Sequence, residues 1–156
     1  QLITAVEEVN DAQKLVIAQK IVTRFGEDLT GFTFGIWGLA FKPGTDDMRE
    51  APAIYVIKEL VRRGAKIKAY DPKAIEEAKE HYLKGVQNIT YADSKYDVLK
   101  DSDALVLLTE WKEFRSPDFE EIKIQLKTTV IFDGRNQYIA YDLENKGIEY
   151  HRIGKI

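Results

Sequence analysis

The stretch "TFGIWGLAFKPGTDDMREAPAIYVIKELVRR", residues 33–63, decides the fold class of this chain. Its first part, residues 33–41, is short, apolar and rich in aromatic residues, which is typical of a buried strand. From Ala51 the sequence is helical, with Ile54, Ile57 and Val61 predicted on one face. Pro52 falls near the first turn, where its missing N–H is not needed. A strand therefore leads through a charged loop into a helix.

The rest of the chain repeats this alternation of strand and helix. Further strands are predicted at residues 65–72, 88–93, 103–110, 129–135 and, at an edge, 147–154. Helices are predicted at residues 73–83 and 118–126, with a weak one at 96–100. Strands that are near-continuous apolar runs, separated by helices, indicate a parallel sheet that is covered on both faces. We expect an α/β, Rossmann-like, doubly wound and mainly parallel sheet of about six strands.

An extra helix is predicted at the N-terminal end. Apolar residues at spacings of three and four run to about Phe25, after which Gly26 and Gly31 bracket a short loop. The chain starts at Gln1, already inside this helical pattern, and its single methionine is Met48. We therefore expect the sequence to be a segment of a longer protein.

Composition excludes several classes of function. The 156 residues carry a net charge of -3 and include no cysteine, which excludes disulfides, thiolate nucleophiles and cysteine-ligated metal. His81 and His151 lie in no metal-ligand spacing, and no metal site is predicted. The charge favours neither nucleic acid nor an acidic membrane, and no apolar run approaches the ~20 residues of a membrane span. A cytoplasmic protein is expected.

Three cations follow predicted strands at one edge of the predicted sheet. Lys42 lies just past the first strand, Arg49 at the mouth of the next helix, and Arg135 just past the fifth strand. Ligands bind at the carboxyl ends of the strands in such sheets. Converging cations beside a helix N-terminus suit a phosphate-bearing ligand. Solvated loop charges remain an equally weighted alternative.

A dinucleotide fingerprint is missing from the first loop. Gly35 and Gly38 are three residues apart, and no G-x-G-x-x-G opens the following helix. Asp71 ends the second strand, but it lies 36 residues after Gly35, whereas a ribose-binding acid lies about 20 after the fingerprint. We favour a capping role for Asp71 over ribose binding.

Two further pairs of residues allow more than one interpretation. Asp46 and Asp47 could bind Mg²⁺ or accept a phosphate, but Arg135 stands where a receiver domain needs lysine. We favour the alternative that both acids lie at a helix N-terminus, where negative charge interacts favourably with the helix dipole. Trp111 and Phe114 could stack on a base, and we favour local packing for both.

Four motifs in order resemble a known family: residues 35–53 "GIWGLAFKPGTDDMREAPA", 69–72 "AYDP", 103–114 "DALVLLTEWKEF" and 130–136 "VIFDGRN". They resemble the UDP-binding C-terminal domain of the UDP-glucose/GDP-mannose dehydrogenase family. The "TEWKEF" motif is more similar to the UDP-glucose branch. The stretch "AVEEVNDAQK" resembles the end of the family's central domain. The resemblance implies a connecting helix at residues 1–28 and a UDP-sugar-binding domain at residues 29–156.

The resemblance also implies an activity and site residues. Members of the family oxidise the C6 alcohol of a nucleotide sugar twice, here UDP-glucose to UDP-glucuronate, with two NAD and a cysteine nucleophile. By motif position, Phe41, Lys42 and Arg135 would contact the nucleotide sugar, and Arg49 would reach NAD bound by an N-terminal domain. No catalytic residue is expected in this chain, which has no cysteine and should be inactive alone.

The expected partners are the N-terminal and central domains and a second subunit, because the family dimerises through the central domain. Two alternatives stay open. One is another UDP-sugar, such as UDP-N-acetylmannosamine, as the substrate. The other is a non-catalytic nucleotide-binding or receiver-like module, which phosphorylation by acetyl phosphate would reveal.

Overall fold

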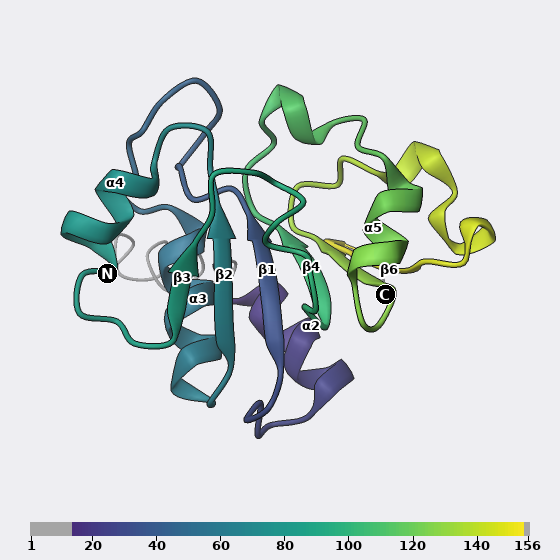
Figure 1. Cartoon of the computed structure of the whole chain (residues 1–156), viewed down its shortest axis with the longest axis horizontal. Coiled ribbons are helices and arrows are strands. Elements are labelled where there is room, and N and C mark those ends of the chain that lie inside the picture. The colour runs from purple at the N-terminus through teal and green to yellow at the C-terminus, as the bar shows by residue number, and fades with distance from the viewer. Residues whose placement is uncertain (1–13, 155–156) are drawn as a thin grey trace, which may run out of the picture.

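The computed structural model describes residues 14–154 and contains one six-stranded parallel sheet (Figure 1). The strands are β1 Thr33–Trp37, β2 Lys66–Tyr70, β3 Ile89–Tyr91, β4 Ala104–Leu107, β5 Val130–Asp133 and β6 Glu149–Arg152. Their spatial order is β3-β2-β1-β4-β5-β6, and every neighbouring pair is parallel. This is the Rossmann strand order, which confirms the predicted fold class. The order reverses between β1 and β4.

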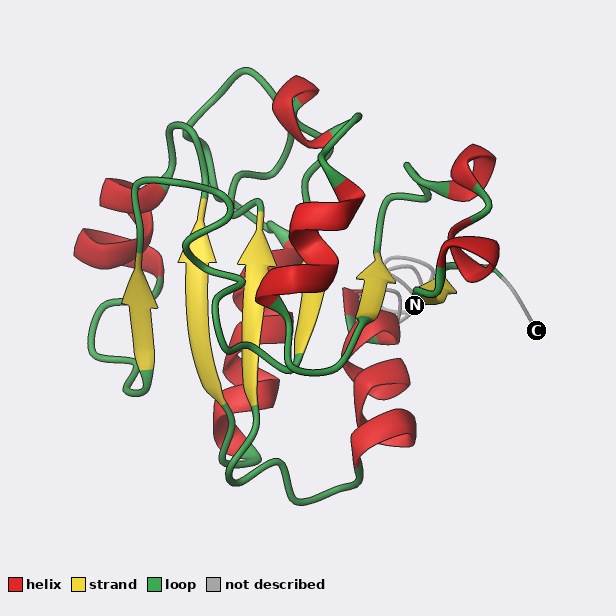
Figure 2. Ribbon diagram, turned by 45° about the vertical axis from the view of Figure 1, so that its right-hand side comes forward, coloured by secondary structure: helices red, strands yellow, loops and turns green. Residues whose placement is uncertain are grey.

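Helices cover both faces of this sheet. The α-helices are α2 Val16–Phe25, α3 Pro52–Arg62, α4 Ile75–Glu77 and α5 Phe119–Gln125. Figures 1 and 2 show α2 and α3 behind the sheet and α5 in front of it. The predicted end of the first helix at Phe25 is confirmed, and its predicted start lies outside the described residues. Short 3-10 helices occupy Lys112–Phe114, Ile139–Tyr141 and Leu143–Lys146.

Two helix predictions need correction. The predicted helix at residues 73–83 is only the short α4 followed by a π-helix, Ala78–Tyr82. The weak helix at residues 96–100 is wrong, because this segment forms successive turns. It packs on β1 at Gly35, where a Cβ atom would lie 2.5 Å from the carbonyl oxygen of Val98. Such close backbone packing needs a residue without a side chain.

The face of α3 that meets the sheet differs slightly from the predicted one. Ile57 is fully buried as expected, whereas Ile54 and Val61 are only partly buried. The buried stripe of the helix consists of Ala53, Val56, Ile57 and Leu60. Pro52 stands in the first turn, as predicted. Because α3 follows β1 in the chain, its N-terminus lies at the carboxyl edge of the sheet, and the buried stripe holds the helix there.

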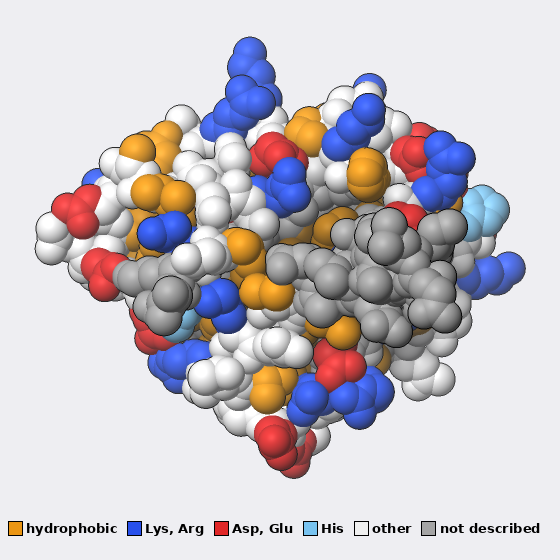
Figure 3. Space-filling view, turned by 180° about the vertical axis from the view of Figure 1, so that it is seen from behind, with side chains coloured by type: hydrophobic (Ala, Val, Ile, Leu, Met, Phe, Trp, Pro, Cys, Tyr) orange, Lys and Arg blue, Asp and Glu red, His pale blue; other side chains and the backbone are white. Residues whose placement is uncertain are grey.

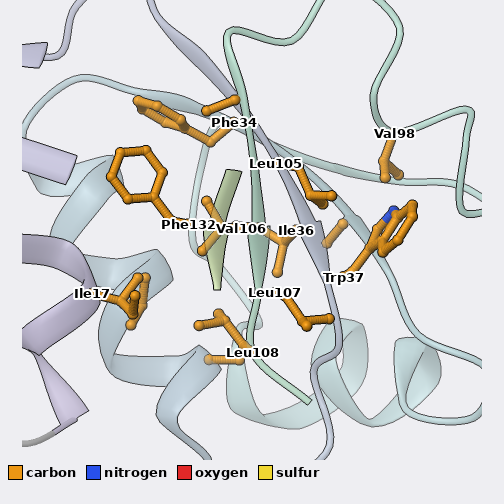
Figure 4. Packing of buried hydrophobic residues seen from close by; sticks show 14 of the residues in the cluster. Ile17, Phe34, Ile36, Trp37, Val98, Leu105, Val106, Leu107, Leu108 and Phe132 are labelled. Carbon is orange, nitrogen blue, oxygen red and sulfur yellow. The ribbon is translucent and has the colours of Figure 1, made fainter. Parts of the chain in front are cut away.

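The core lies on both sides of β1, because side chains alternate between the two faces of a strand. Phe34 packs edge-on against Phe25 of α2, with ring centroids 5.3 Å apart. Trp37 points to the opposite face and stacks on Phe114 at 5.0 Å. Figure 4 shows Trp37 and Val98 on one side of the strands and Ile17 and Phe132 on the other.

No helix in the described part of the chain is long and apolar enough to cross a membrane. On the face behind the sheet, lysine and arginine side chains are interspersed with aspartate and glutamate (Figure 3). Among the side chains of residues 14–154 that this view shows, charges of the two signs are therefore mixed.

Candidate functional site

Three consecutive side chains after β4 connect the loops at the carboxyl edge of the sheet. Thr109 Oγ1 donates a hydrogen bond to the carbonyl oxygen of Ala40 in the loop after β1 (2.7 Å). Glu110 accepts two hydrogen bonds from the guanidinium of Arg135, which follows β5. Trp111 Nε1 donates to Asp71, which follows β2 (3.1 Å). The Thr109–Trp111 triplet thus ties together the ends of four strands.

The loops after β1 and β4 approach each other without an intervening side chain. Gly38 has φ +103°, and a Cβ atom on it would lie 2.5 Å from both Cβ and the backbone nitrogen of Thr109. Only glycine fits this approach and this backbone conformation without strain. The contact sets the position of the loop that carries Phe41 and Lys42.

The carboxylate of Asp71 is buried and fully occupied by hydrogen bonds. It accepts from the backbone N–H groups of Leu39, Ala40, Lys73 and Ala74 and from the indole of Trp111. The predicted capping role is wrong in its position, although the carboxylate does bond backbone N–H groups. Asp71 is not the N-cap residue of α4, because Ala74 stands in that position. The carboxylate instead holds the turn that precedes α4.

Arg135 is held from two directions at the end of β5. Its Nε and Nη2 atoms both donate to Oε2 of Glu110, at 3.1 and 2.7 Å. Its backbone N–H donates to the buried carboxylate of Asp133, which also accepts from the N–H of Tyr138 and the hydroxyl of Tyr150. Burial and the neighbouring Asp133 raise the pKa of Tyr150 well above its usual value. The loop that carries Arg135 is therefore fixed at its root.

A pocket of about 230 Å³ opens beside Arg135. Its lining combines residues that follow β4, β5 and β6 with the start of α3, α2 and the segment just before α2: Lys14, Ile17, Pro52, Val56, Leu108, Gly134, Arg135 and Ile153. Most of the wall is apolar, and the two cations stand in it beside a helix N-terminus. This combination suits an anionic group attached to a larger molecule.

The loop between β1 and α3 holds the other predicted site residues. Phe41 is 49% exposed, and Lys42 is exposed as well. Arg49 donates from Nε and Nη2 to the carboxylate of Asp47, while its side chain is 80% exposed. Hydrogen bonds from Arg49 and the charge of Lys42 hold the pKa of the Asp47 carboxyl below its usual range. Within residues 14–154, no hydrogen bond or ion pair joins Lys42 or Arg49 to Arg135.

The interpretation of Asp46 and Asp47 as charge at a helix N-terminus is wrong. The first turn of α3 contains no acidic residue, since the helix starts only at Pro52. Asp47 instead accepts hydrogen bonds from the backbone N–H and the guanidinium of Arg49. Its role is to shape the loop.

The sequence pattern of the UDP-glucose/GDP-mannose dehydrogenase family, UDP binding domain, matches residues 35–140. The chain belongs to this family. The match includes the Thr109–Trp111 triplet, Asp71 and Arg135. Three residues of the pocket lining, Lys14, Ile17 and Ile153, lie outside the matched range.

Curated relatives agree with this assignment. The chain is 40% identical to the UDP-glucose 6-dehydrogenase of Pseudomonas aeruginosa, over 99% of this chain and 35% of the relative. It is 41% identical to a UDP-glucose 6-dehydrogenase of Bacillus subtilis, over 99% of this chain and 33% of the relative. The chain therefore spans about a third of the length of the curated relatives that it matches.

Solved structures show the same fold. The UDP-glucose dehydrogenase of Pyrobaculum islandicum superposes with a TM-score of 0.76 at 29% identity, over 95% of this chain and 31% of that one. A UDP-D-ManNAc dehydrogenase of Pyrococcus horikoshii superposes with a TM-score of 0.68 at 24% identity, over 92% of this chain and 30% of that one. The second likeness shows the fold alone.

A resident dinucleotide does not fit this UDP-binding domain. Its sheet has the dinucleotide-binding strand order, but the loop after β1 lacks the glycine fingerprint. The acid at the end of β2, Asp71, is already bonded by five N–H groups and is only 2% exposed. A ribose hydroxyl would have to displace bonds that hold two loops together. The fold therefore retains the dinucleotide topology without the dinucleotide site.

Arg135 is a candidate site residue from the sequence, whereas Glu110, which holds it, is not. Trp111 and Phe114 are buried, as the packing interpretation predicted. The loop from Thr109 to Phe114 is a candidate by its place after a buried strand, but no role is predicted for Thr109 or Glu110 within it. That position is the signal that could have identified them, because polar residues there face neighbouring strand ends.

Proposed function

We propose that this chain is the UDP-sugar-binding domain of an NAD-dependent dehydrogenase that oxidises UDP-glucose to UDP-glucuronate. The observation that carries the proposal is the placement of Arg135 in a pocket at the carboxyl edge of the sheet, beside the N-terminus of α3. The UDP-glucose 6-dehydrogenases of two bacteria, similar over nearly the whole chain, support the choice of substrate.

The predicted site residues at the carboxyl edge of the sheet would make different contacts with the ligands. Arg135 supplies a planar fork for a phosphate oxygen, and the exposed Lys42 supplies a mobile point charge. Phe41, which is 49% exposed, offers an apolar surface to the ligand. Arg49 lies in the same loop with its side chain 80% exposed, and it would reach a NAD molecule bound by another domain.

The chemical step would depend on residues outside this chain. The chain has no cysteine, so the nucleophile that the family uses must come from elsewhere in the parent protein. We assign residues 1–28 to a connecting helix of a central, dimer-forming domain and residues 29–156 to the UDP-sugar-binding domain. The isolated chain should bind the nucleotide sugar and leave it unchanged.

Parallel calorimetric titrations with UDP, UDP-glucose, UDP-N-acetylmannosamine and NAD test this proposal. Each charge-assisted hydrogen bond contributes about 1.5–3 kcal/mol, so one arginine and one lysine predict a dissociation constant of about 1 mM for UDP. The three UDP ligands should bind with similar affinity, because the sugar lies mainly against the other domains. Stronger binding of NAD than of UDP would contradict the proposal.

A further inference from the structure

We propose that Glu110 is a positioning residue for Arg135, so that it fixes which end of the guanidinium is offered to the ligand. The inference rests on the proposed function, in which Arg135 binds the diphosphate of a UDP-sugar. Its evidence, however, is the geometry of the pair itself.

The two hydrogen bonds engage one side of the guanidinium. Nε and Nη2 of Arg135 both donate to the same oxygen, Oε2 of Glu110, at 3.1 and 2.7 Å. Among the described residues, Nη1 of Arg135 has no hydrogen-bond partner. The Nη1–Nη2 end therefore keeps the N–H donors that bind two oxygens of a phosphate in parallel.

Glu110 is itself held on both sides by its neighbours in the chain. Thr109 is bonded to Ala40, and Trp111 is bonded to Asp71, so the backbone on either side of Glu110 is fixed. Its side chain is 23% exposed, compared with 44% for Arg135. The less exposed partner is thus the anchor, and the more exposed partner is the group that it orients.

Orientation before binding has a definite consequence for affinity. An arginine that is free to rotate must lose side-chain freedom when it binds an anion, and this loss opposes binding. Because Glu110 already orders Arg135 in the free protein, the entropy cost of ordering this side chain on binding is smaller. The same carboxylate also weakens the attraction of Arg135 for an anion through its own negative charge. Replacing the charge while keeping the acceptor oxygen separates the two effects.

The variants Glu110→Gln and Glu110→Ala separate the ordering of Arg135 from the effect of the negative charge. Glutamine retains an acceptor of the same reach, so UDP should bind as tightly as in the original chain or more tightly. Alanine releases the guanidinium, so UDP binding should weaken about threefold to tenfold. Glu113→Ala is the matched control, because Glu113 lies in the same loop, bonds Tyr70 and does not contact Arg135. The control should change UDP affinity less than twofold.

A double-mutant cycle shows whether Glu110 acts through Arg135. Once Arg135→Ala is present, Glu110→Ala should have no further effect on UDP affinity. An equal loss in both backgrounds would overturn the proposal, as would an unchanged or tighter Kd in Glu110→Ala alone. Loss of UDP affinity in Glu110→Gln equal to that in Glu110→Ala would also overturn it.

A readout without ligand keeps this inference separate from the proposed function. The Nε–H signal of Arg135 in an NMR spectrum, assigned by its loss in Arg135→Ala, should be protected from exchange with water. It should remain protected in Glu110→Gln and become exchange-broadened in Glu110→Ala. An unprotected signal in the original chain overturns the positioning role. If Arg135→Ala leaves UDP affinity unchanged while the signal is protected, the proposed binding site fails instead.

Discussion

Trp111 donates its indole N–H to the carboxylate of Asp71, 40 residues earlier in the chain, over 3.1 Å. The bond joins the loop after β4 to the loop after β2, and β1 lies between these two strands in the sheet. The same carboxylate bonds the backbone at the end of β1 through Leu39 and Ala40. A buried acid that resembles a ribose ligand in sequence is thus the structural centre of this edge.

Removing the charge of Asp71 should destabilise the fold. Asp71→Asn replaces one acceptor oxygen with an NH₂ group that faces N–H donors, so we expect a loss of about 3 kcal/mol or more in the free energy of unfolding by urea. Asp46→Asn makes the same change at an exposed position of the first loop and should cost at most about 0.5 kcal/mol. Weaker NAD binding by Asp71→Asn at unchanged stability would instead support the ribose role.

Gly38→Ala tests the close approach of the loops after β1 and β4. The variant combines a left-handed backbone, φ +103°, with a Cβ atom 2.5 Å from the backbone of Thr109. We expect a loss of about 3–5 kcal/mol in the free energy of unfolding. Gly44→Ala is the control, because Gly44 has φ +86° but no atom of the described residues within 4 Å of its Cβ position. It should cost about 1–2 kcal/mol, and an equal loss in both variants would refute the steric account.

Stability should fall in alkaline solution through Tyr70. Burial, followed by its hydrogen bond to Glu113, raises the pKa of Tyr70 to about 12 from a usual value of 10.0. The unfolded chain therefore loses this proton at lower pH than the folded chain, so stability is full below pH 10.0 and declines between 10.0 and about 12. Urea unfolding across this range should show a shallower decline for Tyr70→Phe. An identical decline in both proteins would show that Tyr70 does not contribute.

The fork geometry of Arg135 should matter more than its charge. Arg135→Lys keeps the cation but loses the paired N–H groups, so UDP should bind about tenfold more weakly. Arg62→Lys is the matched control, because Arg62 lies in the last turn of α3 and, within residues 14–154, pairs only with Glu59. Its UDP affinity should stay within about twofold of the original value. Full UDP affinity in Arg135→Lys would show that a point charge suffices.

The strands could be predicted from the sequence because each is a short apolar run between polar segments. Residues 96–100 were predicted as a helix from their composition, yet they form turns, because the backbone at Val98 packs directly on Gly35. That packing depends on a strand more than 60 residues away, which no local pattern records. Tertiary contact overrode local propensity there.

The candidate site was predictable only in part. Arg135 was identifiable as a candidate because a cation directly after a buried strand of a parallel sheet lies at its carboxyl edge. The acceptors of the site were not identifiable, since Glu110 and Asp71 acquire their roles from partners that are 25 and 40 residues away. Asp47 was misinterpreted because its carboxylate bonds the backbone N–H and the guanidinium of Arg49 within the loop, and a helix dipole pattern does not predict that pairing.

The most direct test of the account is a map of the UDP site on this chain. A titration of the isotope-labelled protein with UDP, followed by backbone amide NMR signals, reports which residues sense the ligand. We predict that the largest shifts fall on the loop after β1, around Phe41 and Lys42, and on residues 134–136 after β5. Shifts confined to the opposite edge of the sheet, around Arg62 and Gly64, would contradict the placement of the UDP site.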